Sequence, residues 1–511
     1  MITAFTIPEH RRKWWVLAAM ACSISMIFID QSIIPVALPT IQKEFNISEL
    51  GLQWLINAYL LTLTAFVLAG GRLGDMLGHR KIFCIGIFTF TIASLFCGFS
   101  NSAEWFIISR ALQGVGGALI IPTAPAMLAS AFPADQQGRA FGFYISIAAF
   151  FLSIGPMIGG LLTQFLNWRY VFWINIPIAA IGLILTFISL SKSPTRDEHF
   201  DYLGFFTNAF GVICVIVGLM QGKEWGWTYW AVPTLIFVGV LLILALALFD
   251  RKVKDPFIDF NLFRNRSYVA ANCCVFAIQF LLMLTIFWTV YFQNVLHYTP
   301  SFAGLWSMIS SSPVIVFGQF SGYLSDKFGP KLPIILGFLC VILGILWFIF
   351  VPTPSTPWAL IPLVLLFGSG IPMVLLPSFT LSMTSIPQHK RGVAVGINST
   401  LRQFSATLGM AIFGQIFLNL HSHLFSKHLA STPATANLDP APFEGILSSA
   451  PQAVQALCAL PSGIGERVYT DYLSSYIFSS TVLNALGIVV AIAGLVLALF
   501  LIKWGRYTQT N

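Results

Sequence analysis

The chain has 511 residues, of which 57% are hydrophobic and only 9% charged, and its formal net charge is +8. Soluble domains carry about a quarter charged residues, so this composition excludes an ordinary water-soluble protein and predicts a lipid environment. No GxxxxGK[ST] phosphate loop occurs, and no segment is left over for a soluble nucleotide-hydrolysing domain.

Apolar runs of about 20 residues, the length that a helix needs to cross the hydrocarbon core, recur along the whole chain. They are unbroken and contain Gly and Pro, which is typical of membrane helices and not of the short alternating strands of a barrel. We therefore predict an all-α polytopic membrane protein. Its fourteen spans are predicted at 14–36, 52–70, 82–99, 105–128, 140–162, 170–190, 203–221, 230–249, 268–292, 302–323, 333–351, 358–379, 392–418 and 478–502.

The basic residues predict the orientation of these spans. With alternating sides, twenty of the 27 Lys and Arg residues fall on the side of the two termini and five on the other, and Arg110 and Arg402 lie inside spans. The basic side is cytoplasmic by the positive-inside rule. We expect both termini there, and the net charge reflects topology rather than nucleic-acid binding.

Residues 420–476 are predicted to form a long external loop, rich in Ser, Ala and Pro. The loop contains three histidines (His421, His423 and His428), whose spacing fits no strong metal-binding pattern. We predict no metal and no cofactor. Cys458 stands alone in this loop and the other seven cysteines lie in spans, so no disulfide framework is expected.

One acidic residue, Asp30, lies well inside a predicted span, whereas the other eighteen lie in loops or near span ends. A charge at this depth costs about 2.5–3.5 kcal/mol on insertion scales and normally faces a protein interior or a watery cavity. Burial disfavours the ionised form, so such a carboxylate can exchange protons near neutral pH. We favour proton or cation coupling over the alternative, a structural carboxylate permanently paired with an arginine.

Arg110 is the candidate partner of Asp30. It shares one helix face with Gln113, because the two residues are three positions apart. Arg402 lies in a similar context, four residues after Asn398, and a structural bond to facing carbonyls is an alternative role for it. No histidine lies in the middle of a span, so a histidine relay is not expected.

A motif in the loop after the second predicted span, GGRLGDMLGHRK (70–81), has a degenerate copy, SGYLSDKFGPK (321–331), after the tenth. Such duplication is expected of transporters built from related halves. Small residues allow backbones to approach, and the charges can form a latch that closes the cytoplasmic side; the alternative is a loop that only enforces topology. The predicted latch comprises Gly71, Gly74, Asp75, Gly78, Arg80, Lys81 and Asp326.

GGRLGDMLGHRK resembles the loop signature of the major facilitator superfamily, with Met76 where a basic residue is usual. SRALQGVGGA (109–118) resembles its fourth-helix arginine motif, and SIGPMIGG (153–160) the fifth-helix motif associated with antiporters. The segments FIDQSIIPVALPTI (28–41) and WRYVFWINIPIA (168–179) narrow the resemblance to the fourteen-span drug:proton antiporter family, over nearly the whole chain.

The resemblance implies the major facilitator fold: a six-helix bundle at 1–192, two inserted helices within 193–266, and a second six-helix bundle at 267–511. It implies export of amphiphilic compounds in exchange for protons, with Asp30 and Arg110 at the coupling positions. The implied partners are a small lipophilic substrate, protons and the bilayer of the plasma (bacterial inner) membrane. The resemblance leaves open a periplasmic adaptor with an outer-membrane channel, and a monomer is expected. Acids that many multidrug relatives carry in later helices are not evident, which argues against polyvalent cations.

Two further groups of residues are expected to contribute to transport. The first gives the fifth span a smooth, kinked surface that can pack tightly and restrict leak: Gly155, Pro156, Gly159 and Gly160. The second consists of candidate contacts to substrate, for which interhelical bonding is the alternative role: Asn57, Gln113, Gln279, Trp288, Asn398, Arg402 and Gln403.

Three functional classes stay open at this point. A proton-coupled exporter of amphiphilic compounds comes first, and an exporter or exchanger of one defined metabolite, siderophore or peptide comes second, because one scaffold serves both. A receptor or membrane enzyme comes third. An enzyme would need a nucleophile with a base, or a metal cluster, at membrane depth, and the sequence offers neither.

Overall fold

The computed structural model of the protein describes residues 9–190, 201–249, 260–351, 357–386, 391–436 and 438–502. Within these ranges, 13 helices are long and apolar enough to cross a membrane, and Ala231–Leu246 forms a shorter apolar helix. Each of the fourteen predicted spans falls on one of these helices or on two consecutive ones. The prediction of an all-α polytopic fold is therefore confirmed.

The N-terminal half contains six spans, the last of which is broken near Ile174 into two helices. Side-chain oxygens begin two of its helices, since Ser48 and Ser102 each accept a hydrogen bond from a backbone N–H of the first turn. The helices are α1 (Glu9–Phe45), α2 (Glu49–Leu77), α3 (His79–Gly98), α4 (Ala103–Ala131), α5 (Ala134–Phe165), α6 (Tyr170–Trp173) and α7 (Asn175–Ser189).

Two more helices, α8 (Tyr202–Trp225) and α9 (Ala231–Phe249), follow as an antiparallel pair. Their backbones approach closely at glycines: an added Cβ at Gly239 would lie 2.7 Å from the carbonyl oxygen of Gly211. The predicted boundary between 192 and 193, before this pair, lies outside the described residues.

The C-terminal half again contains six spans, two of which are broken into consecutive helices. One break precedes Pro313, which cannot donate a backbone hydrogen bond to the preceding turn. The helices are α10 (Arg266–Leu282), α11 (Leu284–Asn294), α12 (Pro300–Ser311), α13 (Pro313–Phe328), α14 (Lys331–Phe350), α15 (Ile361–Thr384), α16 (Arg391–Ser431), α17 (Pro451–Cys458) and α18 (Ser462–Leu501), with 3-10 turns η2 (Phe260–Arg264), η3 (Pro357–Leu360) and η5 (Ala441–Phe443).

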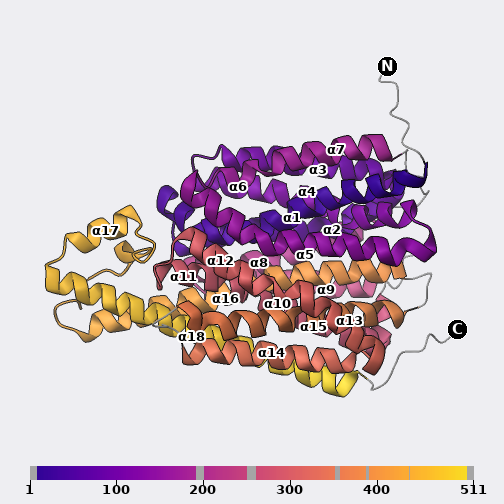
Figure 1. Cartoon of the computed structure of the whole chain (residues 1–511). Helices are drawn as coiled ribbons and strands as arrows, with labels where there is room; N and C mark the ends of the chain where they lie inside the picture. The colour runs from indigo at the N-terminus through magenta and orange to yellow at the C-terminus, as the bar shows by residue number, and fades with distance from the viewer. Residues whose placement is uncertain are drawn as a thin grey trace.

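The prediction of a long loop over 420–476 is wrong at both of its ends. α16 continues to Ser431 and α18 already begins at Ser462, so the two helices project beyond the bundle and carry α17 at their tip (Figure 1). The projection is held by an aromatic face that the sequence interpretation overlooked. The buried ring of His421 contacts the rings of Tyr472 and Tyr476, with centroids 4.5 and 5.6 Å apart. We call residues 420–476 the lobe.

The lobe marks one end of the molecule, which we call the lobe end. α1 begins and α18 finishes at the opposite, or terminal, end (Figure 1). The two halves lie side by side along this axis, the N-terminal helices in indigo to purple and the C-terminal ones in orange to yellow.

The duplicated motif forms the same turn in both halves. Gly78 separates α2 from α3 with φ +93°, and Gly329 separates α13 from α14 with φ +85°. Both glycines are the last Gly of the Gly-x-Leu-x-Asp-x-x-Gly pattern. A backbone with this φ is open to glycine and costly for other residues, so the motif specifies a tight helix–helix turn in each half.

We expect Gly78→Ala to lower the free energy of unfolding by about 1–3 kcal/mol, because alanine must adopt the strained φ. Thermal melting of the purified protein in detergent measures this as a lower midpoint. Gly71→Ala is the matched control, since its added Cβ would meet Pro122 at 3.5 Å, an ordinary contact. Equal melting temperatures for the two variants would contradict the assignment of strain to Gly78.

Candidate functional site: a buried carboxylate and the interface between the halves

Asp30 lies in the middle of α1 with no exposed surface. Its Oδ2 accepts a hydrogen bond of 2.7 Å from Nη1 of Arg110, and its Oδ1 accepts one of 2.8 Å from Nε2 of Gln113. Both donors come from α4, where a spacing of three residues places them on one face. The carboxylate is thus neutralised by a charged partner and bonded at both oxygens.

A second set of side chains surrounds this pair, and sequence analysis did not select it. Asn175 of α7 donates to Ser94 of α3 at 2.9 Å and approaches Oδ1 of Asp30 at 3.5 Å. The guanidinium of Arg110 lies over the ring of Tyr59, 4.3 Å from its centroid. Asn175 belongs to the WINIP stretch, where an amide inside an apolar segment was the available signal. Five helices therefore meet at one buried polar cluster.

The arrangement of this cluster allows one chemical exchange, in which a proton on Asp30 would replace its ion pair with Arg110. While Asp30 is ionised, it satisfies Arg110, which would otherwise be an uncompensated buried cation. A proton on Asp30 would remove that attraction and free α1 to move relative to α4. The cluster can therefore link protonation to a rearrangement within the N-terminal half.

At the lobe end, α5 packs against α12 of the other half with almost no space between backbones. An added Cβ at Gly304 would overlap the carbonyl oxygen of Pro156, and one at Gly160 would lie 2.5 Å from that of Pro300. Ser153 also donates to the carbonyl of Ser311 at 3.0 Å. The opposite side of α5 packs on α1, where Cβ atoms at Gly155 and Gly159 would overlap Ser32 and Ile33. The small residues of SIGPMIGG thus serve two helix contacts at once.

The second contact between the halves joins α2 to α16. The hydroxyls of Thr64 and Thr407 are hydrogen bonded at 2.9 Å, and an added Cβ at Gly414 would overlap the side chain of Gln53. α8 covers this seam from outside, because the carbonyl of Met220 accepts a 2.6 Å hydrogen bond from Gln415. An inserted helix therefore takes part in closing the lobe end.

A small cavity remains between the halves next to this seam. Its volume of about 40 Å³ has room for only a few water molecules, since one probe-sized water needs about 10–15 Å³. A drug-sized compound therefore does not fit here unless the halves separate. The lining combines amides and aromatic rings: Gln42, Leu52, Gln53, Ile286, Phe287, Val290, Asn294, Met410, Phe417, Leu418 and Tyr476.

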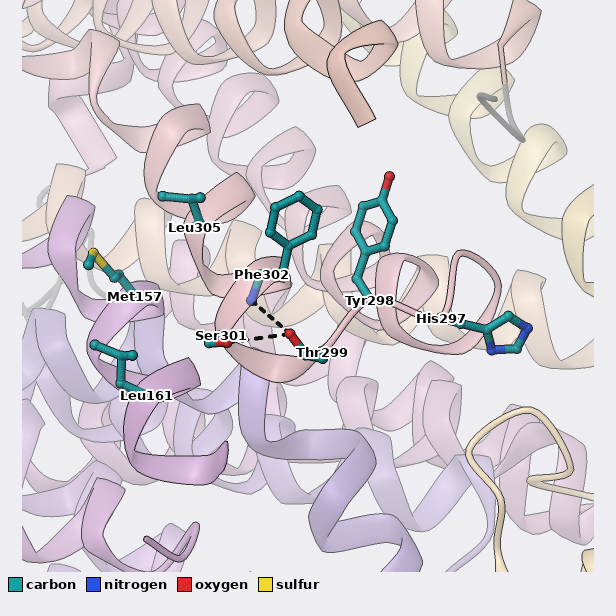
Figure 2. A pocket seen from close by; sticks show the side chains of 8 residues that line it. All are labelled: Met157, Leu161, His297, Tyr298, Thr299, Ser301, Phe302 and Leu305. Carbon is teal, nitrogen blue, oxygen red and sulfur yellow. Dashed lines mark hydrogen bonds between the residues drawn. The ribbon is translucent and has the colours of Figure 1, made fainter. Parts of the chain in front are cut away.

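A larger, open hollow of about 470 Å³ lies at the rim of the α5–α12 contact. Figure 2 shows that it is bordered by α5 on one side and by the connection into α12 on the other. Tyr298 and Phe302 pack edge to face there, with centroids 4.9 Å apart. None of its lining residues belongs to the Asp30 cluster: they are Met157, Leu161, His297, Tyr298, Thr299, Ser301, Phe302 and Leu305.

Most of the predicted latch residues lie around the turn between α2 and α3, and their contacts differ in part from expectation. Asp75 pairs with His79 at 3.2 Å, a partner that sequence analysis did not name, while the guanidinium of Arg80 lies over the ring of Phe187. Lys81 is exposed. The close backbone approach is at Gly70, where a Cβ would overlap the carbonyl of Ala118, and not at Gly71. Asp326 lies in α13, but its side chain is outside the described part of the structure.

The predicted substrate contacts do not form one group. Trp288 is buried in the C-terminal half, where its Nε1 donates to Asn484 at 2.9 Å, so its indole is not available to a ligand. Asn57 faces α8, with its Nδ2 2.8 Å from the sulfur of Met220. Asn398 donates to Asn272 of α10 at 3.0 Å. Gln279, Arg402 and Gln403 are partly buried, and Gln113 belongs to the Asp30 cluster. The sequence pattern could identify polar residues inside apolar spans, but it could not predict in which direction each side chain points.

Comparison with known proteins gives a consistent result. Residues 20–410 match the Major Facilitator Superfamily. The multidrug resistance protein Stp of Mycobacterium tuberculosis is 34% identical over 82% of this chain and 79% of its own. The riboflavin transporter RibZ of Clostridioides difficile is 30% identical over 84% of this chain and 93% of its own. The tetracenomycin C resistance and export protein of Streptomyces glaucescens is 27% identical over 95% and 91%.

The fold is also found among solved structures. A bacterial homolog of the human lysosomal transporter Spinster, in an inward-facing and occupied conformation, superposes with a TM-score of 0.66 at 16% identity. The superposition covers 96% of this chain and 98% of that one. At this identity the likeness concerns the fold alone.

Proposed function

Given that this chain belongs to the major facilitator superfamily, and is a polytopic membrane transporter rather than an enzyme, we propose that it exports amphiphilic compounds in exchange for protons. The observation that carries the proposal is the Asp30 cluster. A single carboxylate at membrane depth, held by Arg110 and Gln113, has the properties expected of a proton-coupling group.

In the proposed cycle the protein carries a proton in one direction and substrate in the other. Deprotonation of Asp30 toward the cytoplasm restores its pair with Arg110 and leaves the space between the halves free for substrate. Bound substrate favours the outward-facing form, where external protons return to Asp30 and help to displace the cargo. Each step requires a different affinity for proton or substrate in the two forms, because a ligand with equal affinity for both shifts nothing.

We further propose an orientation in the membrane, the contacts that close each side, and the parts of the chain that move. We place both termini in the cytoplasm, from the distribution of Lys and Arg, which makes the lobe end external. The contacts α5–α12 and α2–α16 then close the external side, and the motif around Asp75 contributes to closing the cytoplasmic side in the other conformation. The two bundles at 1–192 and 267–511 are the bodies that move, and α8 follows the seam.

The breadth of the cargo is the point on which the relatives differ. The names of Stp and of the tetracenomycin C protein concern drug resistance and export, whereas that of RibZ names one nutrient. The second candidate function is therefore the export or exchange of one defined metabolite. Partners beyond substrate, proton and bilayer are not required by the cycle.

The test is transport by purified protein in liposomes under an imposed pH gradient, with a lipophilic fluorescent dye inside. Wild-type protein is expected to accelerate dye efflux only while the gradient lasts, and a protonophore is expected to abolish the acceleration. A response to a sodium gradient instead of the pH gradient would refute proton coupling. If no dye moves under either gradient, the broad-specificity export proposal fails and single metabolites become the cargo to screen.

A further inference from the structure

Two arginines lie inside membrane spans, and their environments differ. Arg110 is bonded to Asp30 and Gln113 and donates through Nε to the carbonyl of Leu55. Arg402 is partly buried, and its enclosed Nε has no hydrogen-bond partner among the described residues. The ion pairs recorded there join Asp30 to Arg110, Asp75 to His79 and Glu44 to Arg169. Arg402 is therefore a cation at membrane depth without a recorded counter-charge.

The contacts of α16 define the direction in which Arg402 faces. Ser405 donates to the carbonyl of Phe276 at 2.5 Å, and a Cβ at Gly409 would lie 2.9 Å from that of Phe280, so this side of α16 lies along α10. Met410 and Phe417, at i+8 and i+15 from Arg402, line the small cavity between the halves. By helical periodicity Arg402 lies at the edge between α10 and the inter-half space. Its side chain leans toward the N-terminus of α16, away from the closed lobe end.

The balance of charge inside the spans follows from these two arginines. Asp30 and Arg110 cancel one another, whereas Arg402 leaves one net positive charge beside the space between the halves. Such a charge is costly in a low-dielectric setting unless an anion neutralises it. One turn earlier, Oδ1 of Asn398 is also buried, and it has no hydrogen-bond partner in the described part of the chain. An anion with a neighbouring hydrogen-bond donor would satisfy both side chains.

We propose that Arg402 binds the anionic group of the transported compound, so that this protein prefers amphiphilic anions to neutral compounds of the same shape. Carboxylate and sulfonate groups both fit, because the planar guanidinium donates two parallel hydrogen bonds to a pair of oxygens on one group. This preference specifies the substrate class of the proposed export function. That the bound anion is transported rests on the proposed function. Binding itself does not require transport.

The experiment compares two probes of the same shape. 5-Dimethylaminonaphthalene-1-sulfonate carries a negative charge, and the corresponding sulfonamide is neutral. Binding to purified wild-type protein in detergent is measured by fluorescence, in a zwitterionic buffer of low ionic strength so that small anions compete little, and without any gradient. We expect the sulfonate to bind more tightly than the sulfonamide. Arg402→Gln should weaken sulfonate binding at least about tenfold and leave sulfonamide binding within about twofold, and Arg402→Lys should retain part of the preference.

Lys427→Gln is the matched control, because it removes one exposed positive charge from the same helix. It should leave both affinities unchanged. Equal loss of both probes in Arg402→Gln would overturn the proposal and make Arg402 a structural residue, as would unchanged binding of both. Failure of gradient-driven efflux with selective sulfonate binding intact would refute export while leaving the anion site standing.

Discussion

Asp30→Asn is expected to abolish efflux driven by a pH gradient while dye binding survives. Asparagine keeps the size of the side chain and one acceptor oxygen, but it can neither release a proton nor carry the charge that balances Arg110. With Nη1 of Arg110 only 2.7 Å from Oδ2, the ion pair and the proton compete for the same oxygen. We expect the gradient-driven rate in liposomes to fall by at least about two orders of magnitude, since an uncoupled carrier gains nothing from the gradient.

The controls separate coupling from folding. Asp30→Glu restores a carboxylate and should recover part of the driven rate. Thr186→Val alters a buried hydroxyl of the same half that bonds only within its own helix, to the carbonyl of Gly182, and should transport as wild type does. Wild-type rates in Asp30→Asn would assign coupling to another group. Loss of dye binding together with transport would make Asp30 a structural residue.

Gly304→Ala is expected to disrupt the closed lobe end. The added methyl group would overlap the carbonyl oxygen of Pro156, so α5 and α12 must separate, and overpacking of this kind costs about 1–3 kcal/mol. The conformation closed at this end would become less populated, and a transporter that cannot close one side leaks or stalls. We expect gradient-driven efflux to fall at least about tenfold.

A chemical cross-link reports the same change independently of transport. The hydroxyls of Thr64 and Thr407 lie 2.9 Å apart across the other seam, so the pair Thr64→Cys and Thr407→Cys should form a disulfide on mild oxidation. Gly304→Ala should lower its yield, whereas Gly463→Ala, which has no atom within 4 Å of its added Cβ, should not. Each single-cysteine variant controls for the eight native cysteines. An unchanged yield and an unchanged rate would show that α5 and α12 tolerate separation.

Local properties of the chain were enough to predict the class of fold. Span length and apolar composition depend on the bilayer and on single segments, so the positions of the long apolar helices could be predicted before any contact was known. The duplicated motif could also be recognised from a short stretch of sequence. In the structure its last glycines, Gly78 and Gly329, form matching turns. Asp30 and Arg110 could be selected because a charge inside an apolar run is conspicuous whatever it touches.

Only the tertiary structure decided which polar residues meet. The rotation and tilt of each helix bring Asn175 and Ser94 to Asp30, turn Trp288 into the C-terminal half and point Asn57 at α8. The helices of the lobe could not be predicted from hydropathy for the same reason. Around His421 they are stabilised by contacts between aromatic rings of α16 and α18. Whether a buried cation has a partner is likewise a property of packing, which is why Arg110 and Arg402 look alike in sequence and differ in the folded chain.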